Sequence, residues 1–129
     1  MKSAFLLSTD KELFAHTYGI LASLPGWVSA LSMLQLIDDR GHVFNLWDVP
    51  ADDPDFEFDL RQPIDGWWGE GIPPNPAELT ACYVECRWED MFIHWVEYIA
   101  DRLGAPLWVW DSSGALWPAK GIDPHELLL

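Results

Sequence analysis

Hydrophobic residues recur along this chain in two kinds of pattern. Short apolar runs at residues 3–7 and 80–84 predict buried strands. Each run is followed by a helical pattern in which apolar residues recur at i, i+1, i+5, i+8 and i+9, which gives one apolar stripe per helix. The two stripes consist of Leu13, Phe14, Tyr18, Leu21 and Ala22 in the first helix and Met91, Phe92, Val96, Ile99 and Ala100 in the second.

Start and stop signals bound both predicted helices. Thr9 and Glu12 have the spacing of a capping box, and a Leu-Pro-Gly sequence at 24–26 predicts the end of the first helix. The second helix is expected over residues 89–103, because Gly104 follows as a stop signal. Each helix is therefore expected to have about four turns.

A hairpin is expected after each helix. It joins two strand-like runs through an Asp-x-x-Gly turn, and the aspartate of such a turn bonds the turn's own backbone. The hairpins comprise residues 28–37 and 43–47 around the turn at 38–41, and residues 107–110 and 115–117 around the turn at 111–114.

These elements predict two strand-helix-strand-strand units. In the simplest packing they form an α+β domain, in which a largely antiparallel sheet carries both helices on one face. A single domain would span residues 1–129, with units at 1–48 and 79–129 joined by a connector at 49–78. The similar patterns fit either an internal duplication or two independent units of the same type, and the fold expectation is the same for both.

The charge of the chain favours basic protein partners. Its 129 residues include 21 acidic and seven basic side chains, which gives a formal net charge of −14. Such a surface repels nucleic acid and anionic lipid, and no apolar run approaches the length of about 20 residues that crosses a bilayer. We therefore expect a cytoplasmic protein that binds neither nucleic acid nor membrane. An alternative is that the acidity serves solubility alone.

The connector is the predicted working surface. It holds eight acidic residues, one basic residue, six of the ten prolines and two adjacent tryptophans, so it is expected to run over the surface rather than to fill a core. Within it, residues 56–60 alternate strictly, as in a strand at the edge of a sheet. The predicted partner-binding residues are Asp52, Asp53, Asp55, Glu57, Asp59, Asp65, Trp67, Trp68 and Glu70.

The other unusual feature is the number of tryptophans, which is nine. Trp108 and Trp110 alternate with aliphatic residues, so both indoles are expected on one face of a strand. Together with Trp117 they would wall a possible ligand pocket. In the alternative interpretation these rings form a second small core beneath the connector.

No pattern in the sequence indicates catalysis or a metal site. Cys82 and Cys86 would lie about 13 Å apart on one face of a strand, too far for a mutual disulfide, so we expect two buried thiols. The four histidines fall in separate predicted elements, and the sequence has no phosphate loop, nucleophile elbow or zinc motif. We therefore expect a protein that is not an enzyme and that uses no cofactor or metal.

Three leucines at 127–129 make the C-terminal tail a candidate contact in a homodimer. They are expected either to add an edge strand or to dock in an apolar groove. That groove would belong to the chain itself or to a second copy.

In size, acidity and aromatic-rich α+β composition, the chain resembles the small immunity proteins that bacteria pair with secreted or contact-delivered toxins. The resemblance implies a protein that binds a cognate toxin domain, often a basic nuclease, and blocks its active site with an acidic patch. It rests on overall character, so it assigns no residue. The alternative is a small-molecule binding or sensing module with an aromatic pocket between the two units.

Overall fold

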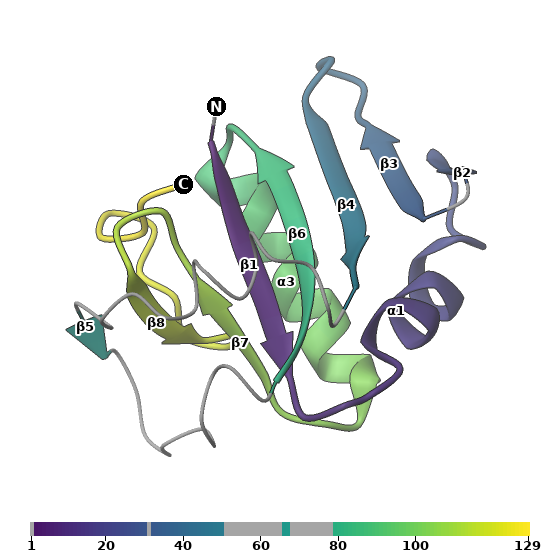
Figure 1. Ribbon diagram of the computed structural model, residues 1–129. Coiled ribbons are helices and arrows are strands. Elements are labelled where there is room, and N and C mark those ends of the chain that lie inside the picture. The colour runs from purple at the N-terminus through teal and green to yellow at the C-terminus, as the bar shows by residue number, and fades with distance from the viewer. Residues whose placement is uncertain (1, 31, 51–65, 68–78) are drawn as a thin grey trace.

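The computed structural model describes residues 2–30, 32–50, 66–67 and 79–129 (Figure 1). The elements follow the order β1, α1, β2, β3, β4, β5, β6, α3, β7 and β8. Their bounds are β1 Ser3–Ser8, α1 Leu13–Leu21, β2 Trp27–Ala30, β3 Met33–Ile37, β4 Val43–Val49, β5 Gly66–Trp67, β6 Thr80–Cys86, α3 Glu89–Leu103, β7 Leu107–Trp110 and β8 Ala115–Pro118.

All of these strands belong to one sheet, in the order β2-β3-β4-β6-β1-β7-β8-β5. Seven strands pair antiparallel, and the two-residue β5 pairs parallel with β8. The predicted α+β class with a largely antiparallel sheet is therefore confirmed, and the fold is mostly sheet. In the inner part, β1 and β4 flank β6, while β6 and β7 flank β1. With α1 and α3 these four strands have the split β-α-β arrangement of ferredoxin-like folds.

The first unit differs from the prediction because residues 28–37 form two strands rather than one. Strands β2 and β3 pair antiparallel, and the pair nearest their connection is Ala30 with Met33. The stretch contains no Gly, Pro, Asn or Asp that would indicate a turn. The sequence therefore predicts one strand where the structure has a hairpin of two.

Helix α3 has the predicted bounds, and helix α1 does not. Gly104 ends α3 with a φ of 76°, a left-handed conformation that favours glycine. Helix α1 is only nine residues long, and the capping box expected at Thr9 and Glu12 is absent. Instead, Asp10 accepts a hydrogen bond of 2.9 Å from the backbone N–H of Glu12. A local bond of this kind competes with the helical backbone and delays the start of the helix.

The main core combines one set of alternating strand residues with buried side chains of both helices. Its strand side chains come from one face of the sheet, and the buried side chains of α1 and α3 belong to the same cluster. Figure 1 shows α3 behind β1 and β6. The largest fully buried members include Leu6, Leu13, Phe44, Phe92 and Trp117. None of the described helices combines the length and the hydrophobicity that a membrane span requires.

The two Asp-x-x-Gly turns have the same hydrogen-bonding pattern, as predicted. Asp38 accepts bonds from the backbone N–H groups of Arg40 and His42 at 2.9 and 2.8 Å. Asp111 accepts equivalent bonds from Ser113 and Ala115 at 2.9 and 3.1 Å. The glycines that close the turns have φ values of 76° and 86°, which only glycine adopts without strain.

Asp111 additionally fixes the C-terminal residues. Its carboxylate is buried and accepts the indole N–H of Trp117 at 3.0 Å and the backbone N–H of Leu128 at 3.3 Å. Ser112 donates from both its backbone and its hydroxyl to the carbonyl of Leu128. Leu127 is buried in the main core. Of the predicted arrangements for the terminal leucines, docking in a groove of the chain itself is therefore the one observed.

The matched turns give a stability test. We expect Asp111→Ala to lower the free energy of unfolding by about 3 kcal/mol, because it removes the acceptor of the buried indole N–H of Trp117 and of the partly buried backbone N–H of Leu128. Asp38→Ala removes the same turn bonds at a more exposed site and should cost about 1 kcal/mol. Urea denaturation followed by tryptophan fluorescence measures both. Equal losses in the two variants would show that the bonds to Trp117 and Leu128 contribute nothing.

Candidate functional site

The sheet face opposite the main core is organised as rows of side chains that cross the strands. Because paired residues of neighbouring strands project to the same side, the register places one residue per strand in each row. Three such rows are complete enough to define. We call them the polar row, the aromatic row and the apolar row.

The aromatic row takes one residue from each of the seven antiparallel strands. Following the sheet order from β2 to β8, it consists of Ala30, Met33, Trp47, Tyr83, Phe5, Trp110 and Leu116. Ring centroids are 5.8 Å apart between Trp47 and Tyr83, 5.4 Å between Tyr83 and Phe5, and 6.4 Å between Phe5 and Trp110. These are favourable distances for aromatic pairs.

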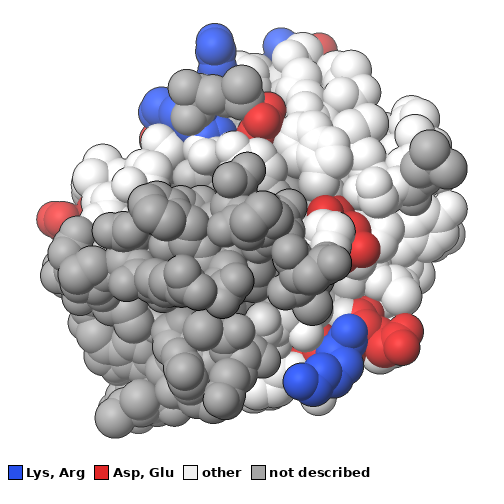
Figure 2. Space-filling view, in the orientation of Figure 1, with Lys and Arg blue, Asp and Glu red and all other residues white. Residues whose placement is uncertain are grey.

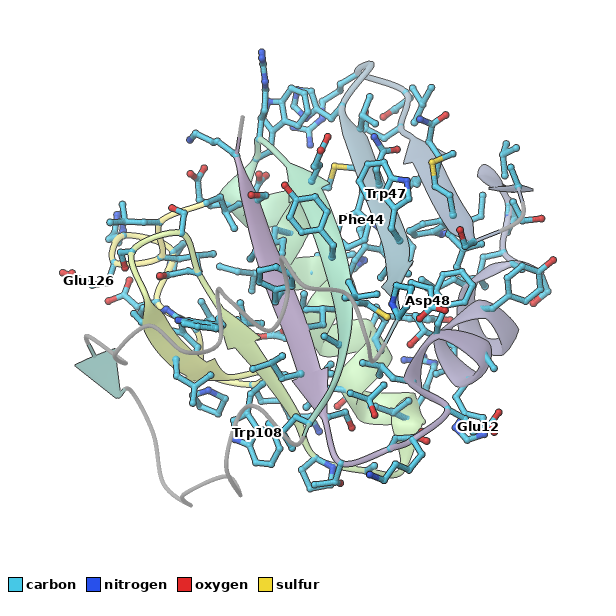
Figure 3. The ribbon with its side chains drawn as sticks, in the orientation of Figure 1. Glu12, Phe44, Trp47, Asp48, Trp108 and Glu126 are labelled. Atoms are coloured by element: carbon cyan, nitrogen blue, oxygen red, sulfur yellow. The ribbon has the colours of Figure 1, made fainter. Side chains whose placement is uncertain are left out.

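Exposure changes along the aromatic row. Trp47, Tyr83 and Phe5 are partly exposed, whereas Trp110 and Leu116 are buried. Figure 3 shows Trp47 in front of β4, on the side away from α3. Figure 2 shows the surface over β3 and β4 on this side to be mainly uncharged, with acidic side chains at its borders. Phe5, Trp47 and Tyr83 therefore form an aromatic surface with a charged rim.

The polar row lies next to the aromatic row and consists of Val28, Gln35, Asn45, Glu85 and Ser3. The amide N–H of Gln35 donates to the carbonyl oxygen of Asn45 at 2.8 Å. Glu85 forms no ion pair within the described part of the chain. This row therefore presents an amide pair and a carboxylate beside the exposed rings.

A shallow depression of about 270 Å³ lies at the polar row. Lys2 lines it and also forms an ion pair of 2.8 Å with Glu89, which lowers the pKa of that carboxyl through the hydrogen bond from the ammonium group. The ring of Trp88 is stacked at 3.9 Å on that of His42. The complete lining is Lys2, Val43, Asn45, Glu85, Cys86, Arg87 and Trp88.

The apolar row consists of Val49, Ala81, Leu7, Trp108 and Pro118. Trp108 and Trp110 pack with Leu7, Ala81 and Leu116 in a second buried cluster on this face. For these two rings, the predicted alternative of a second small core is therefore the one observed. The predicted pocket of three tryptophans is not formed, because Trp117 has the opposite strand parity and lies in the main core.

Most predicted partner-binding residues lie outside the described part of the chain: Asp52, Asp53, Asp55, Glu57, Asp59, Asp65, Trp68 and Glu70. The exception is Trp67, whose backbone pairs with Leu116 at the end of the aromatic row. The connector that holds these residues leaves β4 after Val49 and returns at β6, where Val49 and Ala81 are paired neighbours. Both of its ends therefore adjoin the aromatic surface.

The partly exposed rings of Phe5, Trp47 and Tyr83 were missed as site residues. Each lies two residues from a polar residue of its own strand, namely Ser3, Asn45 or Glu85, so the period of two could have assigned the ring to that residue's face. What the sequence does not contain is the strand order that places the three rings side by side. Among the described residues, no three His, Cys, Asp or Glu side chains are grouped closely enough to bind a metal ion.

One titratable pair lies at the start of α1. Asp10 accepts a hydrogen bond from the ring Nδ1 of His16, which lowers the pKa of Asp10 and raises the pKa of His16. Between pH 3.8 and pH 6.5, the ordinary pKa values of Asp and His, both side chains are charged and their attraction stabilises the folded protein. Its contribution is lost as pH rises through the pKa of His16 or falls through that of Asp10.

We therefore expect an NMR titration of the His16 ring to give a pKa above 6.5. Asp10→Asn should return that pKa towards 6.5, because it removes the negative charge that favours the imidazolium. The variant should also reduce the decline in stability between about pH 6 and pH 8. A pKa that does not change in Asp10→Asn would show that the pair is not populated in solution.

Cys82 and Cys86 are free thiols, buried on the core side of β6. Burial raises the pKa of both, that of Cys86 to about 11. We expect neither thiol to react with a disulfide reagent at about pH 8 while the protein is folded, because the thiolate is the reactive form. Both should react in urea. Fast labelling of the folded protein would contradict their burial.

Comparisons with protein-family models, curated proteins and solved structures found no match.

Proposed function

We propose that this protein is a non-enzymatic binding protein, an immunity or inhibitor protein that neutralises a cognate toxin domain in the cytoplasm. The partner is a basic protein, such as a nuclease-like toxin domain. It is engaged by the aromatic surface of Phe5, Trp47 and Tyr83 together with the acidic connector.

The exposed part of the aromatic row is the observation that carries this proposal. Trp47, Tyr83 and Phe5 are held on three adjacent strands of an antiparallel sheet, so they are ordered before a partner arrives. Aromatic side chains on a rigid support bury a large area with little loss of conformational entropy, and residues of this type dominate binding energy at interfaces. The polar row beside them provides hydrogen-bonding groups, as expected at the rim of such a surface.

The distribution of charge supports a basic partner. The connector has eight acidic residues and one basic residue, so it carries −7 of the net −14. Its ends join the sheet at Val49 and next to Ala81, beside the aromatic surface. Carboxylates placed there would take the positions of phosphates in a basic cleft, which favours fast association and discriminates against other partners.

The test is capture of the partner from the native host, followed by binding and inhibition measurements with purified proteins. Binding should weaken between about 0.1 and about 0.5 M salt, because salt screens opposite charges. The partner's enzymatic activity should fall in proportion to the bound fraction. Binding without inhibition would contradict the immunity function.

Two sets of variants test which residues of this protein contact the partner. Trp47→Ala should weaken binding by about 10- to 100-fold, as at a central aromatic position of an interface. The double variant Asp52→Lys, Asp53→Lys should weaken it further and reduce its salt dependence. The matched control is Asp39→Lys, Glu126→Lys, which changes the net charge equally at exposed positions elsewhere. If the control weakens binding as much, the connector has no specific role.

A second candidate function rests on the depression at the polar row. It lies between β4 of the first unit and β6 of the second, so it supports a small-molecule binding or sensing module with its site between the units. In that function the aromatic ring is Trp88, in place of the predicted Trp108, Trp110 and Trp117. A ligand there would change the fluorescence of Trp88, and no protein partner would be captured at either salt concentration.

A further inference from the structure

A segment of 25 residues in the first half of the chain contains no acidic or basic side chain other than histidine. Residues 13–37 contain no Asp, Glu, Lys or Arg, although such residues number 28 in the chain of 129. The segment forms α1, β2 and β3, which lie together at one end of the sheet in Figure 1. We call this end of the sheet the uncharged corner, because its own elements carry no carboxylate or ammonium group. Asp10, which is paired with His16, and Asp48, which is bonded to Ser32, adjoin it from other segments.

The outermost strand of this corner has an open edge. Within the described residues, β2 pairs with β3 on one side and with no strand on the other. Its residues Val28, Ser29 and Ala30 are exposed. Natural edge strands are usually protected from pairing by short length, charged residues or proline. Strand β2 is short, with four residues, but contains neither a charge nor a proline.

Exposed apolar side chains are concentrated at the same corner. Val28 is 64% exposed on β2, Ile37 is 55% exposed on β3, and Tyr18 is 40% exposed on α1. The hydroxyl of Tyr18 donates to Ser29 at 3.2 Å, which holds the helix against the edge strand. Leu128 at 55%, in the docked C-terminal residues, is the other large apolar side chain with comparable exposure among those described.

We propose that β2 pairs antiparallel with β2 of a second copy of this chain, about a two-fold axis. The absence of charge selects this occupant. A basic partner gains no electrostatic attraction from an uncharged edge, whereas two copies, each with a net charge of −14, approach most easily where neither presents carboxylates. An isologous contact brings the exposed Val28 and Tyr18 of both copies to one interface.

This dimer continues the sheet from one copy into the other and leaves the aromatic surface of both open. It is weak, because a four-residue edge buries less area than a stable interface usually does. It is also distinct from a dimer formed through the terminal leucines, since Leu127 is buried within its own chain.

Sedimentation velocity from about 1 μM to about 1 mM tests the proposal. The mass should rise with concentration from 14.7 kDa towards twice that value. The dimer should strengthen between about 0.05 and about 0.5 M salt, because salt screens the repulsion between like charges. This is opposite to the salt dependence expected for a basic partner. A negative result for the dimer therefore leaves the proposed binding of a basic partner unaffected, and the reverse also holds.

Two variants of matched chemistry locate the contact. Val28→Lys places a charge on the edge and should raise the dissociation constant of the dimer at least about ten-fold. Leu128→Lys makes the same change at a similarly exposed apolar position and should leave it within about two-fold. Both positions are exposed, and circular dichroism would verify the fold. A monomer at every concentration and salt, a dimer unaffected by Val28→Lys, or a dimer lost in Leu128→Lys would each overturn the proposal.

Discussion

The antiparallel pairing of β1 with β6 is the contact on which the rest of the structure depends. It joins the two halves of the chain through six residue pairs, from Ser3 with Glu85 to Ser8 with Thr80. Each of these strands then takes its second neighbour from the other half, since β4 pairs with β6 and β7 pairs with β1. Strands of the two halves are therefore interleaved in the centre of the sheet. The same register determines which side chains share a row across the sheet.

The two faces of this sheet have different chemistry because strand residues alternate between them. One face supplies the main core, and the buried side chains of both helices join it. The other combines a buried apolar cluster under β7 and β8 with partly exposed rings on β1, β4 and β6. A shift of one residue in the β1–β6 register would exchange these sets. Core and candidate site are thus specified by the same strand pairings.

Charge is separated along the chain as well as over the surface. The connector carries half of the net negative charge and begins and ends beside the aromatic surface, while residues 13–37 form an uncharged corner at one end of the sheet. These regions are suited to different contacts. The first is proposed to attract a partner of opposite charge, and the second to allow the approach of a like-charged copy. Among the described acidic residues, Asp111 is the buried one, and its carboxylate organises a turn and the C-terminal residues.

The sequence by itself determined the elements whose signals are local. The α+β class, the bounds of α3, both Asp-x-x-Gly turns and the burial of Cys82 and Cys86 all follow from periodicity and turn chemistry within a few residues. The tertiary structure decided what depends on strand order. It divided residues 28–37 into β2 and β3, put Trp117 on the opposite face from Trp108 and Trp110, and aligned Trp47, Tyr83 and Phe5. The physical reason is that alternation shows that a side chain leaves its strand on one of two faces, whereas only the pairing of strands shows which side chains become its neighbours.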